Sequence, residues 1–274
     1  MSTRVLVTGS RGMLARHLLA QLGDTGVGLD HQQLDISDPS AAASLASGEL
    51  GAFDWVVNCA AYTAVDRAEH DVDRAYAVNA VGPGLIAGAC GMAGIRLIHI
   101  STDYVFDGKK GAPYLETDPT HPRGVYAKSK LVGEESALSQ GATVLRTSWL
   151  YGDGPCFPKS ILRAARAGQS LRVVNDQWGT PTYAGHLAKT ICNFIRMEIE
   201  PGLYHAAGAE VVTWYQLALR VLHFRGLVAD VKSIATADWP TDALRPAYSA
   251  LDSSKLGKTG ALVQGRIEDG FDDV

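Results

Sequence analysis

A short apolar strand pattern that runs directly into a glycine-rich turn constrains the fold of this chain most strongly. The apolar run at residues 4–8 is followed by Gly9 and Gly12, and a helical pattern begins at Met13. Glycines permit the tight turn, and they let backbone N–H groups approach an anionic pyrophosphate at the helix N-terminus. The turn therefore predicts a dinucleotide-binding unit at the start of the chain. Its candidate cofactor-binding residues are Gly9, Arg11, Gly12, Met13 and Leu14.

Further short apolar runs alternate with helical patterns along the first half of the chain. Asp38 followed by Pro39 supplies an N-cap and then a proline at the first helical position, which predicts a helix start. Near-continuous apolar strands separated by helices are typical of a parallel sheet covered on both faces. We therefore predict an α/β fold with a doubly wound, Rossmann-like parallel sheet. The expected strands lie at residues 4–8, 26–30, 53–58, 95–100 and 142–147.

The alternation becomes less regular after Trp149. Helical patterns recur at residues 159–167, 183–197 and 213–224, with turn-rich segments between them. A chain of 274 residues is long for one mixed domain and short for two independent ones. We predict a dinucleotide-binding core at residues 1–150 and mainly a small C-terminal substrate-binding lobe at residues 151–274. A segment at about residues 171–197 is expected to return to the core.

The charge balance and the apolar pattern argue against several classes of partner. The chain carries a net charge of −4, and a mildly acidic chain has no general attraction to nucleic acid or to anionic lipid. The most membrane-like stretch, residues 80–100, contains Pro83 and Arg96 and divides into a small-residue helix and a strand. No apolar core of a signal peptide precedes the first strand pattern. We expect a cytoplasmic protein without nucleic acid or membrane partners.

Three side chains form the strongest candidate for catalytic chemistry. Tyr126 and Lys130 are four residues apart, so on a helix they share a face. A nearby ammonium favours the phenolate and is expected to lower the pKa of the tyrosine, which makes the phenol a usable general acid. Thr102 follows an expected strand and can donate a second hydrogen bond to the same substrate oxygen. The combination predicts reduction of a carbonyl group by a bound nicotinamide, NADPH or NADH.

The choice between these two cofactors stays open at the level of the sequence. Asp30 lies 21 residues after Gly9, at the end of the second expected strand. A carboxylate at this place binds ribose hydroxyls and disfavours a 2′-phosphate. Arg11 in the glycine turn could instead attract that phosphate.

Longer segments of the chain resemble one known family, the dTDP-4-dehydrorhamnose reductases, which are extended short-chain dehydrogenases. The most specific segment, residues 101–108, reads Ser-Thr-Asp-Tyr-Val-Phe-Asp-Gly. The glycine turn at residues 9–15 is shared far more widely. The similarity covers nearly the whole chain, and the other matching segments are residues 34–38, 57–66, Asn79, 126–134, 145–152, 175–182 and 245–246.

The resemblance implies a reaction and a set of site residues. The reaction is reduction of the 4-keto group of a dTDP-4-keto-6-deoxyhexose, most directly of dTDP-4-dehydro-L-rhamnose to dTDP-L-rhamnose. Tyr126 would donate the proton, Lys130 would hold the nicotinamide ribose and Thr102 would polarise the ketone. Further cofactor-binding residues would be Asp35, Ile36, Ala60, Ala61, Tyr62 and Asn79. The sugar would be surrounded by Thr63, Val65, Asp103, Tyr104 and Trp149.

Arg245 is the candidate for the substrate's pyrophosphate, since a guanidinium pairs with it through two hydrogen bonds. Structural roles compete for five of the residues that the resemblance assigns. Trp149 could be a core aromatic, Asp103 a turn cap, and Thr63 the cap of a helix that enters at Val65. Val65 could serve packing alone, and Asn79 could be a buried amide that ties loops together.

The chain also departs from the family pattern. Some members bridge a dimer through magnesium held by glutamates, one of them on the helix after the glycine turn. Here that helix reads Ala15-Arg16-His17, so we expect no such metal. The loop at residues 152–157 lacks the family's asparagines, which leaves a sibling 4-ketoreductase of a deoxysugar or antibiotic pathway open. A homodimer also stays open.

Two other functions are compatible with the same fold. Related dehydratases follow the catalytic threonine with two acids, whereas Asp103 here is followed by Tyr104, which favours simple reduction. A non-catalytic subunit that binds dinucleotide and serves a partner enzyme is the second alternative. Intact Thr102, Tyr126 and Lys130 favour catalysis over that role.

Overall fold

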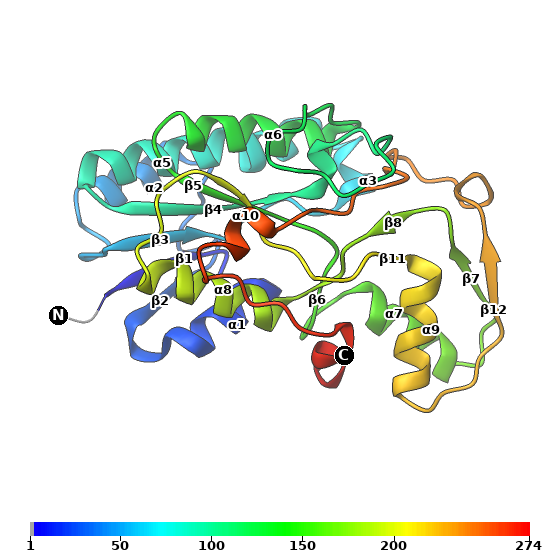
Figure 1. The fold of residues 1–274 in the computed structure, drawn as a ribbon. Helices are drawn as coiled ribbons and strands as arrows, with labels where there is room; N and C mark the ends of the chain where they lie inside the picture. The colour runs from blue at the N-terminus through cyan, green and yellow to red at the C-terminus, as the bar shows by residue number, and fades with distance from the viewer. Residues whose placement is uncertain (1–2) are drawn as a thin grey trace.

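The computed structural model describes residues 3–274 and has a six-stranded parallel sheet at its centre (Figure 1). Across the sheet the strands follow the order β10-β5-β4-β3-β1-β2, so their succession reverses between β1 and β3. Ligands of open α/β sheets bind at such a reversal, outside the carboxyl ends of the strands. The predicted doubly wound sheet is confirmed, and β10 adds an edge strand that the apolar pattern did not identify. The strands are β1 (Val5–Thr8), β2 (Gly26–Leu29), β3 (Trp55–Asn58), β4 (Arg96–Thr102), β5 (Thr143–Thr147) and β10 (Leu203–His205).

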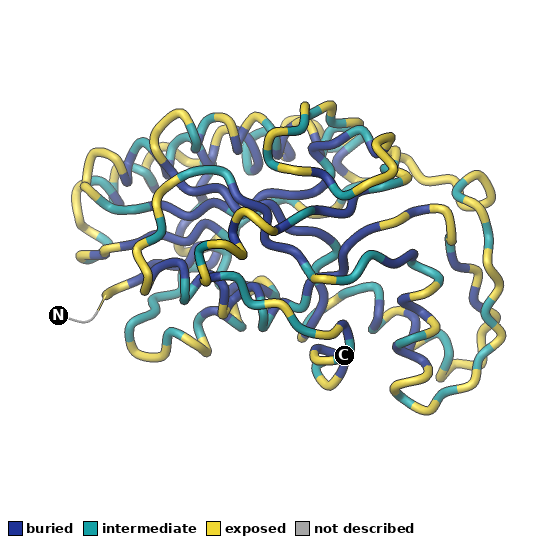
Figure 2. Tube along the Cα trace, in the orientation of Figure 1, coloured by how far each residue is buried: buried dark blue, intermediate teal, exposed yellow. Residues whose placement is uncertain are grey.

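Helices cover both faces of this sheet. On one face α1 (Met13–Leu22) packs against α8 (Ala184–Arg196), and on the other lie α2 (Pro39–Ala46), α5 (Gly82–Ala93) and α6 (Val125–Leu138) (Figure 1). Successive strand residues therefore enter different apolar clusters. In β1, Val5 and Val7 face α1 and α8, whereas Leu6 faces α2 and α5. This burial on both sides explains why the strands are mostly apolar, and Figure 2 shows the central ones as the darkest part of the fold.

One helical stretch is long and apolar enough to cross a membrane by length and composition alone. It comprises α4 (Val72–Tyr76), the π-helical segment η2 (Ala77–Val81) and α5. Half of its most apolar window is buried inside the fold, and the stretch packs against α2 and α6. The widened turn of η2 contains the buried Asn79 and lies directly against α6.

The C-terminal lobe is built from short strand pairs and two helices, α7 (Phe157–Arg166) and α9 (Trp214–Phe224) (Figure 1). Its own apolar cluster includes Leu162, Leu217 and Phe271. The return to the core differs from the one expected at about residues 171–197. The first strand of that segment pairs inside the lobe, whereas α8 and β10 lie on the main sheet. The strand pairs are β7 (Leu171–Val174) with β12 (Val231–Ile234), β8 (Trp178–Gly179) with β11 (Val212–Thr213), and β6 (Leu150–Tyr151) with β9 (Thr182–Tyr183).

The close approach of α6 to η2 leads to a stability prediction. A Cβ atom added at Gly133 would lie 1.9 Å from the backbone oxygen of Asn79, so no side chain fits there. We expect Gly133→Ala to lower the free energy of unfolding by about 1–3 kcal/mol, because α6 must shift to relieve the overlap. Denaturant unfolding measures this change.

Gly91→Ala is the matched control, because Gly91 is also helical and an added Cβ there meets no atom within 4 Å. This variant should be as stable as the parent protein or more stable by up to about 1 kcal/mol. Equal unfolding free energies for the Gly133→Ala variant and the parent would show that α6 is not held against η2.

Candidate active site

The glycine turn is pressed against the residues that follow β3. Gly9 has a φ of +64°, and a Cβ atom there would lie 2.8 Å from the Cα atom of Ala60. Gly12 donates its N–H to the carbonyl of Gly9 at 2.8 Å, which closes the turn. Only glycine satisfies both the backbone conformation and the contact at residue 9. Two segments predicted to bind the cofactor, around Gly9 and around Ala60, are thus brought together at the reversal of strand order.

The N-terminus of α1 has the character of an anion site. Gly12 is its N-cap, and within residues 3–274 no side chain caps this end and no acidic residue lies in the first turn. The first N–H groups of a helix lack partners inside the helix, and the helix dipole makes this end positive. The site therefore fits the diphosphate of a dinucleotide. Met13 opens the helix half-buried, and Leu14 is buried in the core.

Arg11 and Asp30, the two residues that argued for different cofactors, contact each other. The Arg11 Nη2 atom lies 2.6 Å from Asp30 Oδ2. The other carboxylate oxygen accepts from the backbone N–H groups of Gln32 and Gln33 at 2.9 and 3.2 Å. Burial raises the pKa of Asp30, but these hydrogen bonds and the Arg11 charge outweigh it, so the pKa lies below its usual value. Asp30 is thus an anion whose contacts are already made inside the protein.

Asp35 and Ile36 lie beyond β2, on the far side of this pair. Asp35 Oδ1 accepts from the backbone and side chain of Ser37 at 3.0 and 2.6 Å, and its second oxygen lies 3.6 Å from Arg74. Ile36 is buried against Gly82 at the start of α5. Asp35 thus keeps part of its charge at the surface, while Ile36 belongs to the core.

Thr102 and Tyr126 meet at the carboxyl end of β4. Thr102 is the last residue of this strand, and Tyr126 lies in the first turn of α6. The Thr102 hydroxyl lies close enough to the Tyr126 phenol to influence its pKa. The ring of Tyr104 packs edge-on against that of Tyr126, with 5.9 Å between centroids. The carboxylate of Glu69 accepts from the Val125 N–H at 2.7 Å and so fixes the start of the helix.

Burial dominates the titration of the tyrosine. It raises the pKa of Tyr126 to about 12, although the nearby Thr102 hydroxyl acts in the opposite direction. The expected lowering of this pKa by Lys130 is therefore wrong for this structure. The reason is geometric, because the Lys130 amine turns toward β4 and donates to the Ile100 carbonyl at 2.6 Å. Burial lowers the pKa of Lys130 itself to about 8, against the opposing charge of Glu134.

Asp103 is more than a turn cap. Its buried carboxylate accepts hydrogen bonds from the hydroxyls of Thr102 and Ser148, each at 3.1 Å, and from Ser249 of the C-terminal segment. Burial raises the pKa of Asp103 to about 6, although the three hydroxyls lower it. The carboxylate therefore joins three segments that are far apart in the sequence, close to Thr102.

Trp149 follows β5 and stacks in parallel on Trp214, with 3.4 Å between ring centroids. Its backbone has a φ of +47°, a conformation that is rare for a bulky residue. On the ring's edge, Gly179 leaves no room for a side chain. Trp149 therefore lies between the sheet and the lobe, in contact with both, and it packs partly against the lobe's apolar cluster.

The guanidinium of Arg245 forms an ion pair with a protein carboxylate. Its two terminal nitrogens bind the two oxygens of Asp66 at 2.9 and 2.7 Å, which lowers the pKa of Asp66. Its predicted contact with a pyrophosphate requires this pair to open. Asp66 lies on α3 (Val65–Ala68), whose N-cap is Ala64, so Thr63 does not cap this helix and lies exposed beside it.

Asn79 ties the segment after β3 to α6. Its Oδ1 accepts from the Tyr62 N–H at 2.8 Å, and its Nδ2 donates to the Tyr62 carbonyl at 3.0 Å and to Ser129 Oγ at 3.2 Å. Both amide hydrogens are thus used inside the protein. Asn79 positions Tyr62 and, through it, the neighbouring Ala61, which matches the structural role that the sequence left open.

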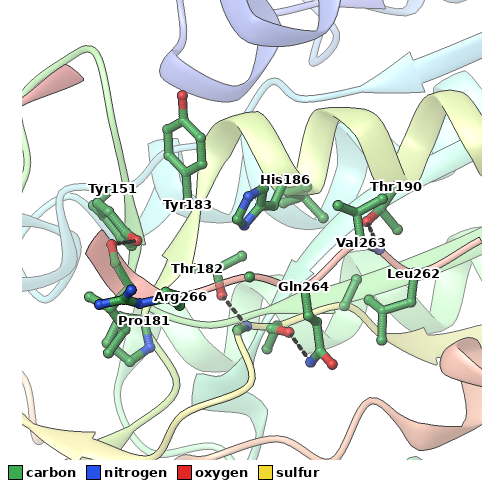
Figure 3. Close-up of a pocket in the computed structure, with 16 residues that line it drawn as sticks. Tyr151, Pro181, Thr182, Tyr183, His186, Thr190, Leu262, Val263, Gln264 and Arg266 are labelled. Carbon is green, nitrogen blue, oxygen red and sulfur yellow. Dashed lines mark hydrogen bonds between the residues drawn. The ribbon is translucent and has the colours of Figure 1, made fainter. Parts of the chain in front are cut away.

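A shallow hollow lies elsewhere, between α8 and the C-terminal segment (Figure 3). Thr190 accepts there from the Val263 N–H at 2.9 Å, and Gln264 donates to Ala207 at 2.8 Å. Neither Thr102 nor Tyr126 lines this hollow, so its hydrogen bonds hold the C-terminal segment to α8 and do not define the reactive site. Within residues 3–274 no group of three His, Cys, Asp or Glu side chains could hold a metal ion.

Sequence reasoning assigned no role to a row of buried polar residues beneath the site. Thr8 Oγ1 donates to Asn58 Oδ1 at 2.6 Å, and Asn58 Nδ2 lies 3.1 Å from His99 Nδ1. His99 Nε2 in turn lies 3.3 Å from the Lys130 amine. The signal in the sequence was polar residues in otherwise apolar strands: Thr8 and Asn58 end β1 and β3, and the parallel register places Asn58 beside His99.

Known proteins resemble this chain over almost its whole length. The family model described as "RmlD substrate binding domain" matches residues 3–273. A dTDP-4-dehydrorhamnose reductase of Mycobacterium tuberculosis is 41% identical, over 94% of this chain and 88% of that protein. A probable dTDP-4,6-dihydroxy-2-methyloxan-3-one 4-ketoreductase of Streptomyces antibioticus is 42% identical, over 94% and 89%.

A solved structure gives the same picture in three dimensions. The dTDP-4-dehydrorhamnose reductase of Bacillus anthracis, determined in complex with NADP, superposes with a TM-score of 0.93. It is 32% identical and covers 99% of this chain and 98% of its own. The sheet order, the glycine turn and the lobe beyond β5 are the architecture of the extended short-chain dehydrogenases. Within that class, the chain belongs to the RmlD substrate binding domain family.

The raised pKa of Asp103 predicts a pH dependence of stability. Because the folded protein holds this proton more tightly than the unfolded chain, the free energy of unfolding falls as pH rises from about 4 to about 6. We expect Asp103→Asn to remove about 1–3 kcal/mol of this fall. Denaturant unfolding at pH 4, 5, 6 and 7 measures it.

Asp107→Asn is the control for this measurement. Hydrogen bonds from Lys109 and Tyr114 lower the pKa of Asp107, so the folded protein does not hold this proton more tightly than the unfolded chain. Parallel stability curves for the parent protein and the Asp103→Asn variant would contradict a buried, weakly acidic Asp103.

Proposed function

We propose that this protein reduces the 4-keto group of a dTDP-4-keto-6-deoxyhexose with a nicotinamide dinucleotide, converting dTDP-4-dehydro-L-rhamnose to dTDP-L-rhamnose. The proximity of the Thr102 and Tyr126 side chains at the end of β4, near the contact of Gly9 with Ala60, carries the proposal. The 41% identity to a named dTDP-4-dehydrorhamnose reductase supports the substrate. The NADP complex of the Bacillus anthracis relative supports the cofactor.

The dinucleotide would be held by residues that fit it chemically. The free N–H groups at the start of α1 suit its diphosphate, with Gly9 and Gly12 allowing the close approach. Asp30 and Arg11 would meet the adenosine ribose or its phosphate, and Lys130 the nicotinamide ribose. When bound, the reduced nicotinamide supplies the hydride. Further contacts would come from Met13, Leu14, Asp35, Ile36, Ala60, Ala61 and Tyr62, with Asn79 positioning the last of these.

The chain's own residues would handle the proton and the negative charge. The phenol of Tyr126 donates its proton to the oxygen of the reduced carbonyl, and a pKa of about 12 keeps that proton in place until the oxygen becomes basic. The Thr102 hydroxyl adds a second hydrogen bond to the developing alkoxide. Thr63, Val65, Asp103, Tyr104 and Trp149 would shape the sugar site, with Arg245 at the pyrophosphate if it releases Asp66.

A sibling 4-ketoreductase is the second candidate. The Streptomyces antibioticus 4-ketoreductase is 42% identical to this chain, which is as similar as the rhamnose enzymes are. Assays of NADPH oxidation with dTDP-4-dehydro-L-rhamnose and with other dTDP-4-keto-6-deoxy sugars separate the two. We also propose that the reaction takes place in the cytoplasm, and a homodimer stays a prediction for solution measurement.

Tyr126 is the proton donor in this proposal. We expect Tyr126→Phe to bind NADPH with unchanged affinity and to lower turnover by about a hundredfold or more, since the proton donor is gone. Keto-sugar-dependent loss of NADPH absorbance measures turnover, and cofactor fluorescence measures binding.

Tyr151→Phe serves as the control, because Tyr151 is also a buried tyrosine but lies at the hollow beside the C-terminal segment. Turnover by the Tyr126→Phe variant at the parent rate would reject the assigned role. Cofactor binding without oxidation by any tested keto sugar would favour the non-catalytic subunit.

The pair of Arg11 and Asp30 bears on the choice between NADPH and NADH. Removal of the Arg11 side chain leaves the Asp30 carboxylate without its cation. We expect Arg11→Ala to raise the KM for NADPH on the order of tenfold more than the KM for NADH, because a bare carboxylate repels a 2′-phosphate. Arg16→Ala, one turn further along α1, is the control. Equal changes for both cofactors would place Arg11 away from the 2′-position.

A further inference from the structure

Four buried polar side chains form a continuous row beneath the candidate active site. Thr8 ends β1, Asn58 ends β3, His99 lies in β4, and Lys130 reaches the row from α6. All four are at most 2% exposed. Buried polar groups need hydrogen-bond partners, and the orientation of one group decides whether the neighbouring atom donates or accepts. The protonation of the row can therefore be worked out from one end to the other.

The amide of Asn58 is oriented by a backbone group. Its Oδ1 atom accepts from the Ala60 N–H at 3.2 Å and from the Thr8 hydroxyl at 2.6 Å. A backbone N–H can only donate, so the oxygen of the amide belongs on this side. The amide's NH₂ group then faces His99 Nδ1 at 3.1 Å. Asn58 thus donates a hydrogen bond to the histidine ring.

This donation decides which nitrogen of His99 carries the proton. Burial and the nearby Lys130 charge lower the pKa of His99 well below its usual value, so the ring is neutral and carries one proton. Because Nδ1 accepts from Asn58, the proton is on Nε2. Nε2 lies 3.3 Å from the Lys130 amine. A ring N–H therefore points at the nitrogen of the lysine.

A donor in this position disfavours an ammonium and favours a neutral amine. An ammonium has only donors, whereas a neutral amine has a lone pair that accepts from the ring N–H. The same amine donates to the Ile100 carbonyl at 2.6 Å in either state. We propose that His99 is a positioning residue that presents its Nε2–H to Lys130 and so lets this lysine exchange a proton near neutral pH.

The other groups near Lys130 do not reverse this effect. Glu134 lies one turn further along α6. Its carboxylate accepts hydrogen bonds from the Arg146 guanidinium and the Ser101 hydroxyl. Cys59, which follows β3, stays a neutral thiol because burial raises its pKa to about 12. Burial lowers the pKa of Lys130 to about 8 even against the nearby Glu134 charge, and the ring N–H of His99 acts in the same direction.

The consequence for catalysis rests on the proposed function. Tyr126 gives up one proton in each reduction and must regain one before the next. Lys130 lies one helical turn away on α6 and is buried, so a lysine that titrates near neutral pH can hold a proton where water is excluded. His99 itself need not touch the cofactor or the substrate for this role.

The test uses the cofactor-free protein and needs no activity. NMR of protein labelled with ¹⁵N-histidine identifies the tautomer of His99, and NMR of labelled lysine side chains gives the titration midpoint of Lys130. We expect the Nε2–H tautomer and a midpoint near or below 8, well under the ordinary 10.5. We expect His99→Gln, which can turn an acceptor oxygen toward the amine, to raise that midpoint by about one pH unit or more.

Two further variants keep the test decisive. Asn58→Leu removes the donor that fixes the tautomer, so it should raise the midpoint of Lys130 as well, and it serves if the His99→Gln variant does not fold. His205→Gln is the control. His205 lies on β10 beside Arg146 of β5 and is another buried, neutral histidine. It should leave Lys130 unchanged.

Either of two results would overturn the inference: the Nδ1–H tautomer of His99, or an unchanged Lys130 midpoint in the folded position-99 or position-58 variant. The proposed function fails separately, if no keto sugar is reduced while these titrations behave as expected. In that case His99 would still control the titration of Lys130, but this titration would have no part in reduction of a keto sugar.

Discussion

A buried ion pair holds the catalytic helix on the sheet, and the site depends on it. Glu134 of α6 accepts from the Arg146 Nε atom of β5 at 2.9 Å and from the Ser101 hydroxyl of β4 at 2.8 Å. Both charges are at most 2% exposed. Removal of one partner from such a pair leaves an uncompensated buried charge, which costs about 3–5 kcal/mol. The pair therefore fixes α6 against two strands at once, and Tyr126 and Lys130 take their places from the helix.

The remaining contacts of α6 restrict it in the other directions. Gly133 lets η2 approach it on one side, and Glu69 holds its first turn by the Val125 N–H. A helix anchored at its start, its middle and its inner face keeps a phenol and an amine buried in fixed surroundings. That burial is what raises the pKa of Tyr126 and lowers the pKa of Lys130. The acid–base character of the site thus follows from how the helix is packed.

The sequence predicted those features that depend on local pattern. Strands buried on both faces are mostly apolar, and Asp38 with Pro39 marks a helix start, so β1 to β5 and α2 were found within a few residues. Contacts between distant segments left no such trace. β7 pairs with β12 across a long stretch of chain, and residues 171–174 therefore lie in the lobe. For the same reason the Arg245–Asp66 pair and the turn of Lys130 toward Ile100 escaped prediction.

The lobe and the sheet share polar contacts at the place where a substrate would lie between them. Asp103, which directly follows β4, accepts hydrogen bonds from the hydroxyls of Ser148 and of Ser249 in the C-terminal segment. That same segment holds α3 through Arg245 and Asp66. Glu69 follows α3 directly and accepts from the Val125 N–H at the start of α6. The C-terminal segment and the helix that carries Tyr126 are therefore joined through one short helix.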